Sequence, residues 1–338
     1  MPPVERLTAP YLWVRRRYLR SINDAACRRH ASELPADAMP TYIVVTPHLV
    51  HLAPLAAQNR ASTVAPVFVA NGLGASDVSW LGAMSPGTPI LVLNASLRSG
   101  SASMLQHGAV IDHLLRTIDR DCCFQDADCF ISDSAFWASM VLKPGRHYAA
   151  GPFLRETTAE RPAYPETFLI RINRALFDSY RRTYGISAEP TARPGRRARE
   201  LLRGGGYAEG RYLETLKDYY DTLQQYWIAA QLDGFTHNFV SGAGSAVHHV
   251  GGTSYLHRSF ENLEHWDYWP LNVHYFHLRL LELPQCARFR DRFRALIDLH
   301  RSSTDLLAAC PEFAGGWRRR ESDLILDRTG ARSVYGAP

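Results

Sequence analysis

The chain has 338 residues, of which 46% are hydrophobic and 21% charged, and this balance is typical of a globular protein that buries a sizeable core. Its net charge is +5, and 36 of the 38 basic residues are arginines, because Lys143 and Lys217 are the two lysines. An arginine bias along the whole chain indicates genome composition rather than a binding patch, so we do not expect a nucleic-acid partner.

The cysteines and the start of the chain predict a cytoplasmic protein. No stretch approaches the roughly 20 apolar residues of a membrane span, and residues 1–30 lack the hydrophobic segment of a secretion signal. Reduced thiols are therefore expected. The six cysteines form no Cys-x-x-Cys pair; they are Cys27, Cys122, Cys123, Cys129, Cys286 and Cys310.

Residues 11–31 predict a basic amphipathic helix within an N-terminal helical extension, residues 1–40. Apolar side chains such as Trp13 and Ile22 alternate with arginines at helical spacing. Two interpretations stay open. The helix packs on the domain with its arginines in solvent, or it makes a peripheral contact with a membrane surface.

A regular alternation of apolar strands and helices begins at residue 41. It predicts an α/β fold with a mostly parallel central sheet and helices on both faces. The carboxyl ends of the strands are the expected place for a ligand. The predicted strands are 42–45, 67–69, 90–93 and 122–124, and the predicted helices are 49–61, 76–81 and 103–118.

The second half of the chain continues with shorter elements. Residues 187–210 are rich in proline, glycine and arginine and predict a mobile loop, and a long helix is expected at 211–232. Residues 259–338 predict a C-terminal helical extension. The remaining predicted elements are helices at 134–141 and 174–184 and strands at 147–153, 167–172, 235–240 and 246–249.

Asp126-Ala127-Asp128 follows the fourth predicted strand. Two carboxylates one residue apart at a strand's end can place their oxygens on one divalent cation, and such a cation can neutralise a diphosphate. The motif alone also occurs in solvated acidic turns. Its position after three strand-helix units and before the segment His248-His249-Val250-Gly251-Gly252 favours a metal site.

In this order the motifs resemble family 2-like glycosyltransferases of the GT-A fold. Residues 41–48 resemble the opening strand and nucleotide-cradling turn of that family, 67–72 its second strand, 94–108 the segment before the metal motif, and 248–254 the histidine element that closes the site. The resemblance covers residues 41–258 and implies a Rossmann-like nucleotide-diphospho-sugar transferase domain there.

The chain also departs from the family's pattern. Ala70 stands where the family has an aspartate that contacts the base, so the identity of the nucleotide base stays open. The Gln-x-x-Arg-Trp signature of processive members is absent, which argues against a polysaccharide synthase.

The resemblance implies a set of donor and metal contacts. We expect Asp128 to bind the metal directly and Asp126 to bind it or the ribose, with one of His248 and His249 completing the shell, because adjacent strand residues face opposite sides. An imidazole ligand favours Mn²⁺ over Mg²⁺. The expected nucleotide-sugar contacts are Thr46, Pro47, Asn71, Arg98, His107, Asp126, Gly251 and Gly252.

An inverting transfer needs a base for the acceptor hydroxyl, and the family's pattern points to Asp221, with Asp218 and Asp233 as fallbacks. Residues 265–269 are aromatic and either stack on a sugar acceptor or pack in the core. His274 and His277 lie three residues apart, but no third zinc ligand lies in register.

These expectations describe a metal-dependent glycosyltransferase of the hexosyltransferase type with a nucleotide-linked donor, UDP being the first candidate. A nucleotidyltransferase is an alternative, but it usually has a glycine-rich basic loop after the first strand, where this chain has Thr46-Pro47-His48. A non-catalytic relative that binds a nucleotide sugar and serves a partner protein is the other alternative.

Overall fold

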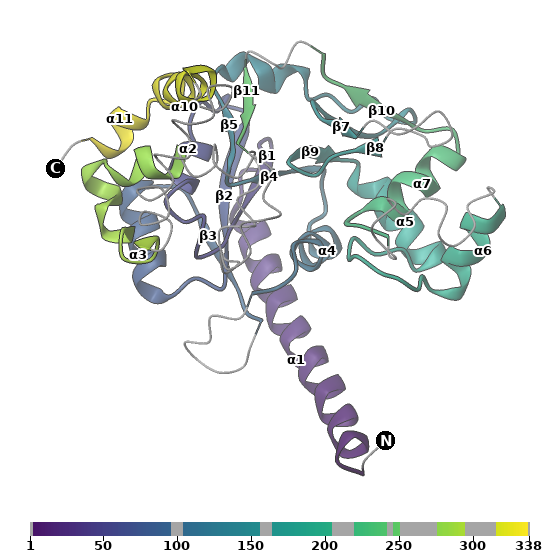
Figure 1. Ribbon diagram of the computed structural model, residues 1–338. Coiled ribbons are helices and arrows are strands. Elements are labelled where there is room, and N and C mark those ends of the chain that lie inside the picture. Colours follow the sequence, from purple (N-terminus) through teal and green to yellow (C-terminus); the bar gives the residue numbers. More distant parts are fainter. Residues whose placement is uncertain are drawn as a thin grey trace.

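The computed structural model describes residues 3–95, 104–155, 164–204, 220–241, 246–250, 276–294 and 316–336. Within these residues the fold is α/β, with a central seven-stranded sheet and helices on both faces (Figure 1). The sheet strands are β1 (Met39–Val45), β2 (Val64–Asn71), β3 (Ile90–Leu93), β4 (Cys122–Asp126), β6 (His147–Gly151), β9 (Leu169–Ile172) and β10 (Thr236–Phe239).

The predicted mostly parallel sheet is confirmed. Its strand order is β10-β6-β9-β4-β1-β2-β3, and β1 pairs in parallel with both β2 and β4. Strand β9 is the antiparallel member, between β4 and β6. The four-strand parallel half, β4-β1-β2-β3, brings the carboxyl ends of β1, β2 and β4 to one edge, where the sequence predicted the ligand.

Side chains of β1 alternate between two hydrophobic cores, as strand geometry requires. Tyr42 and Val44 pack in the core beneath α1 (Pro3–Glu33), α4 (His107–Thr117), α5 (Arg174–Tyr184) and α7 (Gln224–Leu232). Ile43 and Val45 face the opposite core, which α2 (Ala53–Ala56), α3 (Ala75–Met84) and the C-terminal helices cover. The continuous apolar run 42–45 therefore means burial on both faces.

Helix α1 confirms the predicted N-terminal helix and projects beyond the body of the protein (Figure 1). Its second half is tied to the domain, because Asn23 exchanges two hydrogen bonds with the backbone of Asn94 and Asp24 pairs with Arg116 of α4. Val14 and Tyr18 are exposed, and the membrane contact of this helix stays a prediction. Within the described residues, no helix has the length and apolarity to cross a membrane.

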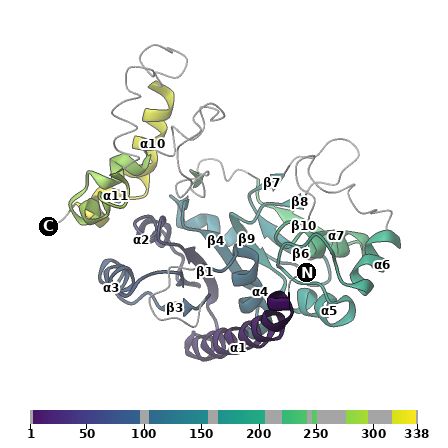
Figure 2. The same cartoon turned by 60° about the horizontal axis from the view of Figure 1, so that its bottom comes forward.

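The described parts of the C-terminal region complete the second core. Residues 276–281 are helical, followed by a short 3-10 helix (Pro284–Phe289), α10 (Gly316–Arg328) and α11 (Ala331–Tyr335). Phe276, Phe289 and Tyr335 pack with Ile43 and Phe68 of the sheet. Figure 2 shows α10 and α11 on the side of the sheet where α2 and α3 lie. These residues therefore bury the sheet face that α2 alone is too short to cover.

Three predicted elements differ in the structure. The helix expected at 49–61 is reduced to α2, since residues 46–52 form successive turns that place Leu49 N on Thr46 O and Leu52 N on Leu49 O. Within the loop expected at 187–210, α6 (Arg196–Gly204) is helical. Of the helix expected at 211–232, residues Gln224–Leu232 are helical (α7), whereas the Tyr220 backbone pairs with Thr191; residues 211–219 lie outside the described residues.

A buried histidine pair joins the turn after β1 to the C-terminal region. His51 Nε2 and His277 Nδ1 lie 2.7 Å apart, and both side chains are fully buried. Burial lowers the pKa of His51 to about 3, and the nearby charges of Arg292 and His48 lower it further. His51 is therefore neutral at pH 7. Within the part of the chain that the structure describes, His277 belongs to no group of three metal-ligating side chains such as a zinc site requires.

Acid is expected to destabilise the protein through this pair. The unfolded His51 has a pKa near 6.5, so below that pH the unfolded chain binds a proton that the folded chain refuses. The free energy of unfolding should then decrease as the pH is lowered, and the slope should approach about 1.4 kcal/mol per pH unit. Urea unfolding midpoints measured from about pH 7 to about pH 5 test this. A His51→Leu, His277→Leu variant should show a shallower slope, and an equal slope would exclude the pair as its source.

Candidate active site

The turn between β4 and the short strand β5 (Cys129–Ile131) holds the two aspartates. Asp126 ends β4 and its amide donates to Phe168 O, while Ala127 is fully buried. Gln125, also buried, donates from Nε2 to Cys129 O and to Ala56 O and so braces the turn. The sequence folds locally into a tight strand-turn-strand whose buried side chains fix the positions of both carboxylates.

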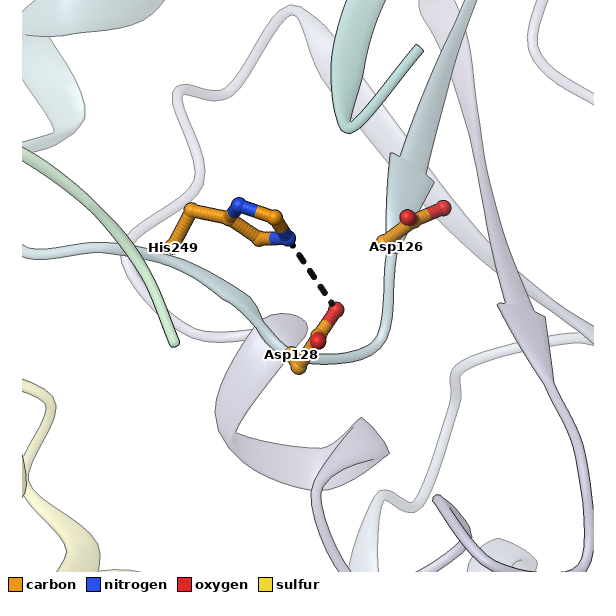
Figure 3. Close-up of side chains that lie close together, drawn as sticks. All are labelled: Asp126, Asp128 and His249. Atoms are coloured by element: carbon orange, nitrogen blue, oxygen red, sulfur yellow. Dashed lines mark ion pairs between the residues drawn. The ribbon is translucent and has the colours of Figure 1, made fainter. Parts of the chain in front are cut away.

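His249 reaches this turn through pairing between distant strands. Strand β11 (Val247–His249) is antiparallel to β5, and its register sets His249 opposite Cys129, the residue after Asp128. His249 Nε2 lies 3.7 Å from Asp128 Oδ1, as Figure 3 shows. Phe168 stacks on the imidazole with ring centroids 3.8 Å apart. A strand register and an aromatic face thus hold the ring against the aspartates.

Strand alternation separates the two adjacent histidines. His248 lies on the other side of β11, where its Nε2 is 3.2 Å from Ser132 Oγ, whereas His249 faces the aspartates. One ligand atom from each of Asp126, Asp128 and His249 lies within 4.8 Å of the others. Of the two histidines offered as metal ligands, the geometry therefore brings His249 to the site and leaves His248 outside the group.

The electrostatics of the group are those of two carboxylates held close together beside one imidazole. Burial, and next the Asp128 carboxylate, raise the pKa of Asp126 to about 8. Burial acts to lower the pKa of His249, but hydrogen bonding to Asp128 and the charges of Asp128, Asp126 and Glu166 raise it overall. These shifts show a site with excess negative charge, which a cation would offset.

The donor set fits a divalent metal ion. Two carboxylates and one imidazole suit Mn²⁺ or a related transition metal better than Mg²⁺, which prefers oxygen ligands alone. Asp128 has 2% of its surface exposed, so its carboxylate is directed into the group rather than into bulk solvent. The aromatic wall made by Phe168 and Phe153 restricts the imidazole of His249.

A pocket of about 550 Å³ adjoins the group, and His107 joins the two. His107 begins α4, lines the pocket, and places its Nε2 3.4 Å from Asp126 Oδ1. Asp221 and Thr222 line the same pocket, opposite residues 106–108 and 190–192. Burial lowers the pKa of His107 to about 4, against the opposing charge of Asp221. We call this space the His107–Asp221 pocket.

Asn71, predicted to contact the nucleotide, has its side-chain amide engaged elsewhere. Its Nδ2 donates to Leu105 O at 2.9 Å, and its Oδ1 accepts from Leu105 N at 2.8 Å. Asn71 has 2% of its surface exposed. These two bonds hold the backbone two residues before His107. Both polar atoms of the Asn71 amide are therefore bound to Leu105, and Asn71 positions the chain at the start of α4.

Of the remaining residues predicted to contact the nucleotide-sugar donor, some lie within the described residues and others lie outside them. Thr46 and Pro47 follow β1 at the same sheet edge as Asp126, and Arg292 donates a hydrogen bond to the Pro47 carbonyl. Arg292 also pairs with Asp77, so the C-terminal region braces this turn. Arg98, Gly251, Gly252, Asp218, His274 and the aromatic segment 265–269 lie outside the described residues.

Two features of the site had no signal in the sequence. Glu166 lies close enough to act electrostatically on both Asp126 and His249. Residues 190–192 line the His107–Asp221 pocket, although they belong to the segment predicted as a mobile loop. A bridge between Thr191 and Tyr220 fixes that segment next to Asp221. Both features depend on contacts between residues far apart in the chain.

Gly108 makes a close contact that supports the pocket wall. A Cβ at this position would lie 2.6 Å from Pro190 Cδ and 2.7 Å from Ala188 O. We expect Gly108→Ala to lower the free energy of unfolding by about 1–3 kcal/mol, since the added methyl group forces the two segments apart. Urea unfolding monitored by circular dichroism measures this change.

Gly82→Ala in α3 is the matched control. Its Cβ would meet Ile90 Cδ1 at an ordinary 3.7 Å, and alanine favours a helix over glycine by about 0.5–1 kcal/mol. Stability should therefore be unchanged or raised. Equal losses in the two variants would mean that close packing at Gly108 is not what matters.

No protein-family model and no curated protein matches the sequence. Similar solved structures include the glycosyltransferase GlyE of Streptococcus pneumoniae TIGR4, at 10% identity and a TM-score of 0.35, over 59% of this chain and 44% of that one. The galactosyltransferase LgtC in complex with donor and acceptor sugar analogues matches at 13% identity and a TM-score of 0.34, over 65% of this chain and 90% of that one. This chain spans less than half of GlyE. At these values the likeness assigns no family.

Proposed function

We propose that the protein is a metal-dependent glycosyltransferase, which moves a sugar from a nucleotide-diphosphate donor to a hydroxyl group of an acceptor. The observation that supports it is the convergence of Asp126, Asp128 and His249 at the carboxyl end of β4, beside a pocket that contains a further carboxylate, Asp221. An isolated acidic turn would have neither the imidazole nor the adjoining pocket.

Asp126, Asp128 and His249 would hold the metal, and Mn²⁺ is our first candidate because one ligand is an imidazole. When bound, such a cation neutralises the negative charge that grows on the departing diphosphate, most strongly in the transition state. Gln125 and Phe168 keep the ligands in place before the donor arrives. This preorganisation reduces the rearrangement required during the reaction.

The nucleotide would lie over the carboxyl ends of β1 and β4, which are neighbours in the sheet. Thr46 and Pro47 directly follow β1 on that edge. UDP is our first candidate for the nucleotide of the donor; other bases stay open, because Ala70 replaces the acidic residue expected to contact the base. The buried side chain of Ala70 offers no hydrogen bond to a base.

Asp221 is our candidate base in the His107–Asp221 pocket. In an inverting transfer it takes the proton of the acceptor hydroxyl as the hydroxyl oxygen bonds to the anomeric carbon. The bond from that carbon to the diphosphate oxygen breaks, and its electron pair leaves with the nucleoside diphosphate. His107, whose pKa burial lowers to about 4, is a weak base at pH 7 and is better suited to hydrogen bonding.

Calorimetric titration with Mn²⁺ and a panel of nucleoside diphosphates, followed by a donor-hydrolysis assay, tests the proposal. A glycosyltransferase should bind a nucleotide in a metal-dependent way and slowly release the donor's sugar to water. Tight binding without sugar release under any acceptor would identify a non-catalytic nucleotide-sugar-binding protein. Release of pyrophosphate from a nucleoside triphosphate would identify a nucleotidyltransferase.

A further inference from the structure

A second pocket, of about 400 Å³, adjoins the His107–Asp221 pocket. Pro190 and Thr191 line both pockets, so the two are neighbours along this short segment of chain. Its other walls come from α1, α4, α5 and the start of α7. We call it the arginine pocket after its charged lining, which consists of Arg20, Arg116, Arg181, Arg193, Asp112 and Glu189.

The lining holds four arginines and two acidic residues, but Arg181 is paired with Asp178 and Arg116 with Asp24, so the positive charge open to a ligand comes from Arg20 and Arg193. Asp112 is 1% exposed and its carboxylate is already saturated: Oδ2 accepts from Arg20 and Arg116, and Oδ1 from Ser187 Oγ and Ala188 N. Its negative charge is therefore compensated inside the wall and does not repel a ligand.

Two of the arginines keep donors for a ligand. Arg20 uses one Nη on Asp112, and half of its side chain is exposed. Arg193 has no acidic partner within the described residues, and its amide donates to Thr191 Oγ1 at the boundary of the two pockets. Arg116 differs, since it is bound on both sides by Asp24 and Asp112 and serves as part of the wall.

Guanidinium groups bind phosphate oxygens through pairs of parallel hydrogen bonds, which a neutral sugar does not require. Asp112 follows His107 by five residues in α4, a rise of about 7.5 Å along the helix axis, so the two pockets lie beside successive turns of the same helix.

We infer that the arginine pocket binds the phosphoryl group of the acceptor, so that the acceptor is a phosphorylated compound with its free hydroxyl in the His107–Asp221 pocket. This inference rests on the proposed glycosyl transfer. The phosphoryl group is that of a soluble sugar phosphate or of a lipid headgroup, and the two sources share the same chemistry at the pocket.

The binding test uses inorganic phosphate as the probe, with EDTA present so that no metal contributes. Wild-type protein should bind phosphate at low ionic strength, and Arg20→Gln, Arg193→Gln should weaken binding by about tenfold or more, because charge-assisted hydrogen bonds are lost. Arg196→Gln is the control, since Arg196 pairs with Glu200 on exposed α6 and does not line the pocket. No binding by the wild type, or equal affinity in the three proteins, would overturn the inference.

The source of the phosphoryl group, a soluble sugar phosphate or a lipid headgroup, is tested by measuring consumption of the sugar donor. One arm compares hexose phosphates with the same hexoses lacking phosphate, and the other compares phosphatidylcholine vesicles with and without phosphatidic acid. Faster consumption with phosphate in either arm, lost in the Arg20→Gln, Arg193→Gln variant, supports the inference; no difference in both arms overturns it. Mn²⁺-dependent nucleotide binding, measured in parallel, should be equal in the variant and the wild type. Its absence from the wild type would reject the proposed function itself.

Discussion

Asp128→Ala is expected to abolish Mn²⁺-dependent nucleotide binding while the protein stays folded. Removing an outer partner of a metal ligand typically costs about 10- to 100-fold in metal affinity, so loss of a direct ligand should cost more than about 100-fold. The fold should survive, because the Asp128 carbonyl still accepts from Val250 N and the repulsion between Asp128 and Asp126 is relieved. Calorimetry with Mn²⁺ and UDP, paired with urea unfolding, measures both quantities.

Asp119→Ala is the matched control for this change in charge. Asp119 lies before β4, at the opposite end of the strand, and 85% of its side chain is exposed. It should bind nucleotide as the wild type does. Asp128→Asn, which keeps the buried volume and removes the charge, should lose binding without any loss of stability. Unchanged nucleotide affinity in both Asp128 variants would reject the metal group.

Substitution of each of the adjacent histidines, His248 and His249, provides a second test of the metal group. His249→Ala should remove the nitrogen coupling of an imidazole from the electron spin echo spectrum of bound Mn²⁺, whereas His248→Ala should keep it. The reason is that β11 directs His249 to Asp128 and His248 to Ser132. An imidazole signal lost only in the His248 variant would contradict the register of β11 against β5.

Asp221→Asn is expected to reduce turnover by about 100- to 10,000-fold while donor affinity changes little. The amide keeps the shape of the side chain but cannot take the acceptor's proton. The donor should still bind, since Asp221 does not belong to the metal group of Asp126, Asp128 and His249. Donor consumption measured at saturating donor, together with calorimetric affinity for the nucleotide, separates the two effects.

Asp233→Asn provides the comparison within the same region. Asp233 was a fallback for the base, but its Oδ2 accepts from Tyr180 OH at 2.6 Å and it does not line the His107–Asp221 pocket. Its variant should turn over normally. Near-normal turnover of Asp221→Asn would remove Asp221 as the base and favour a retaining transfer, in which no base is needed at that position.

Much of the site's position could be predicted from local patterns. The apolar run before Asp126 marked a buried strand, and the aspartates followed it because a strand's end is where polar side chains emerge. Strand alternation predicted that one of His248 and His249 faces the site, and the structure places His249 there. The donor roles of Thr46, Pro47 and Asp126 remain predictions.

Other parts of the site could not be predicted locally. Thr191 and Tyr220 pair across a segment that the composition marked as a loop, and this pairing places residues 190–192 beside Asp221 in the lining of the His107–Asp221 pocket. Asn71 appeared as a ligand because it ends a strand, but its amide holds Leu105. Composition and period describe a residue's own segment, whereas these contacts depend on which segments become neighbours.

Taken by itself, the sequence determined the alternation of strands and helices, the mostly parallel sheet and the edge at which Asp126 and Asp128 emerge, because burial on both faces leaves continuous apolar runs. The tertiary structure alone decided that His249 meets Asp128 and that the arginine pocket adjoins the His107–Asp221 pocket. The physical reason is the same in both cases: strand pairing and helix packing join residues more than a hundred positions apart, such as Cys129 with His249, and no local periodicity records that choice of partner.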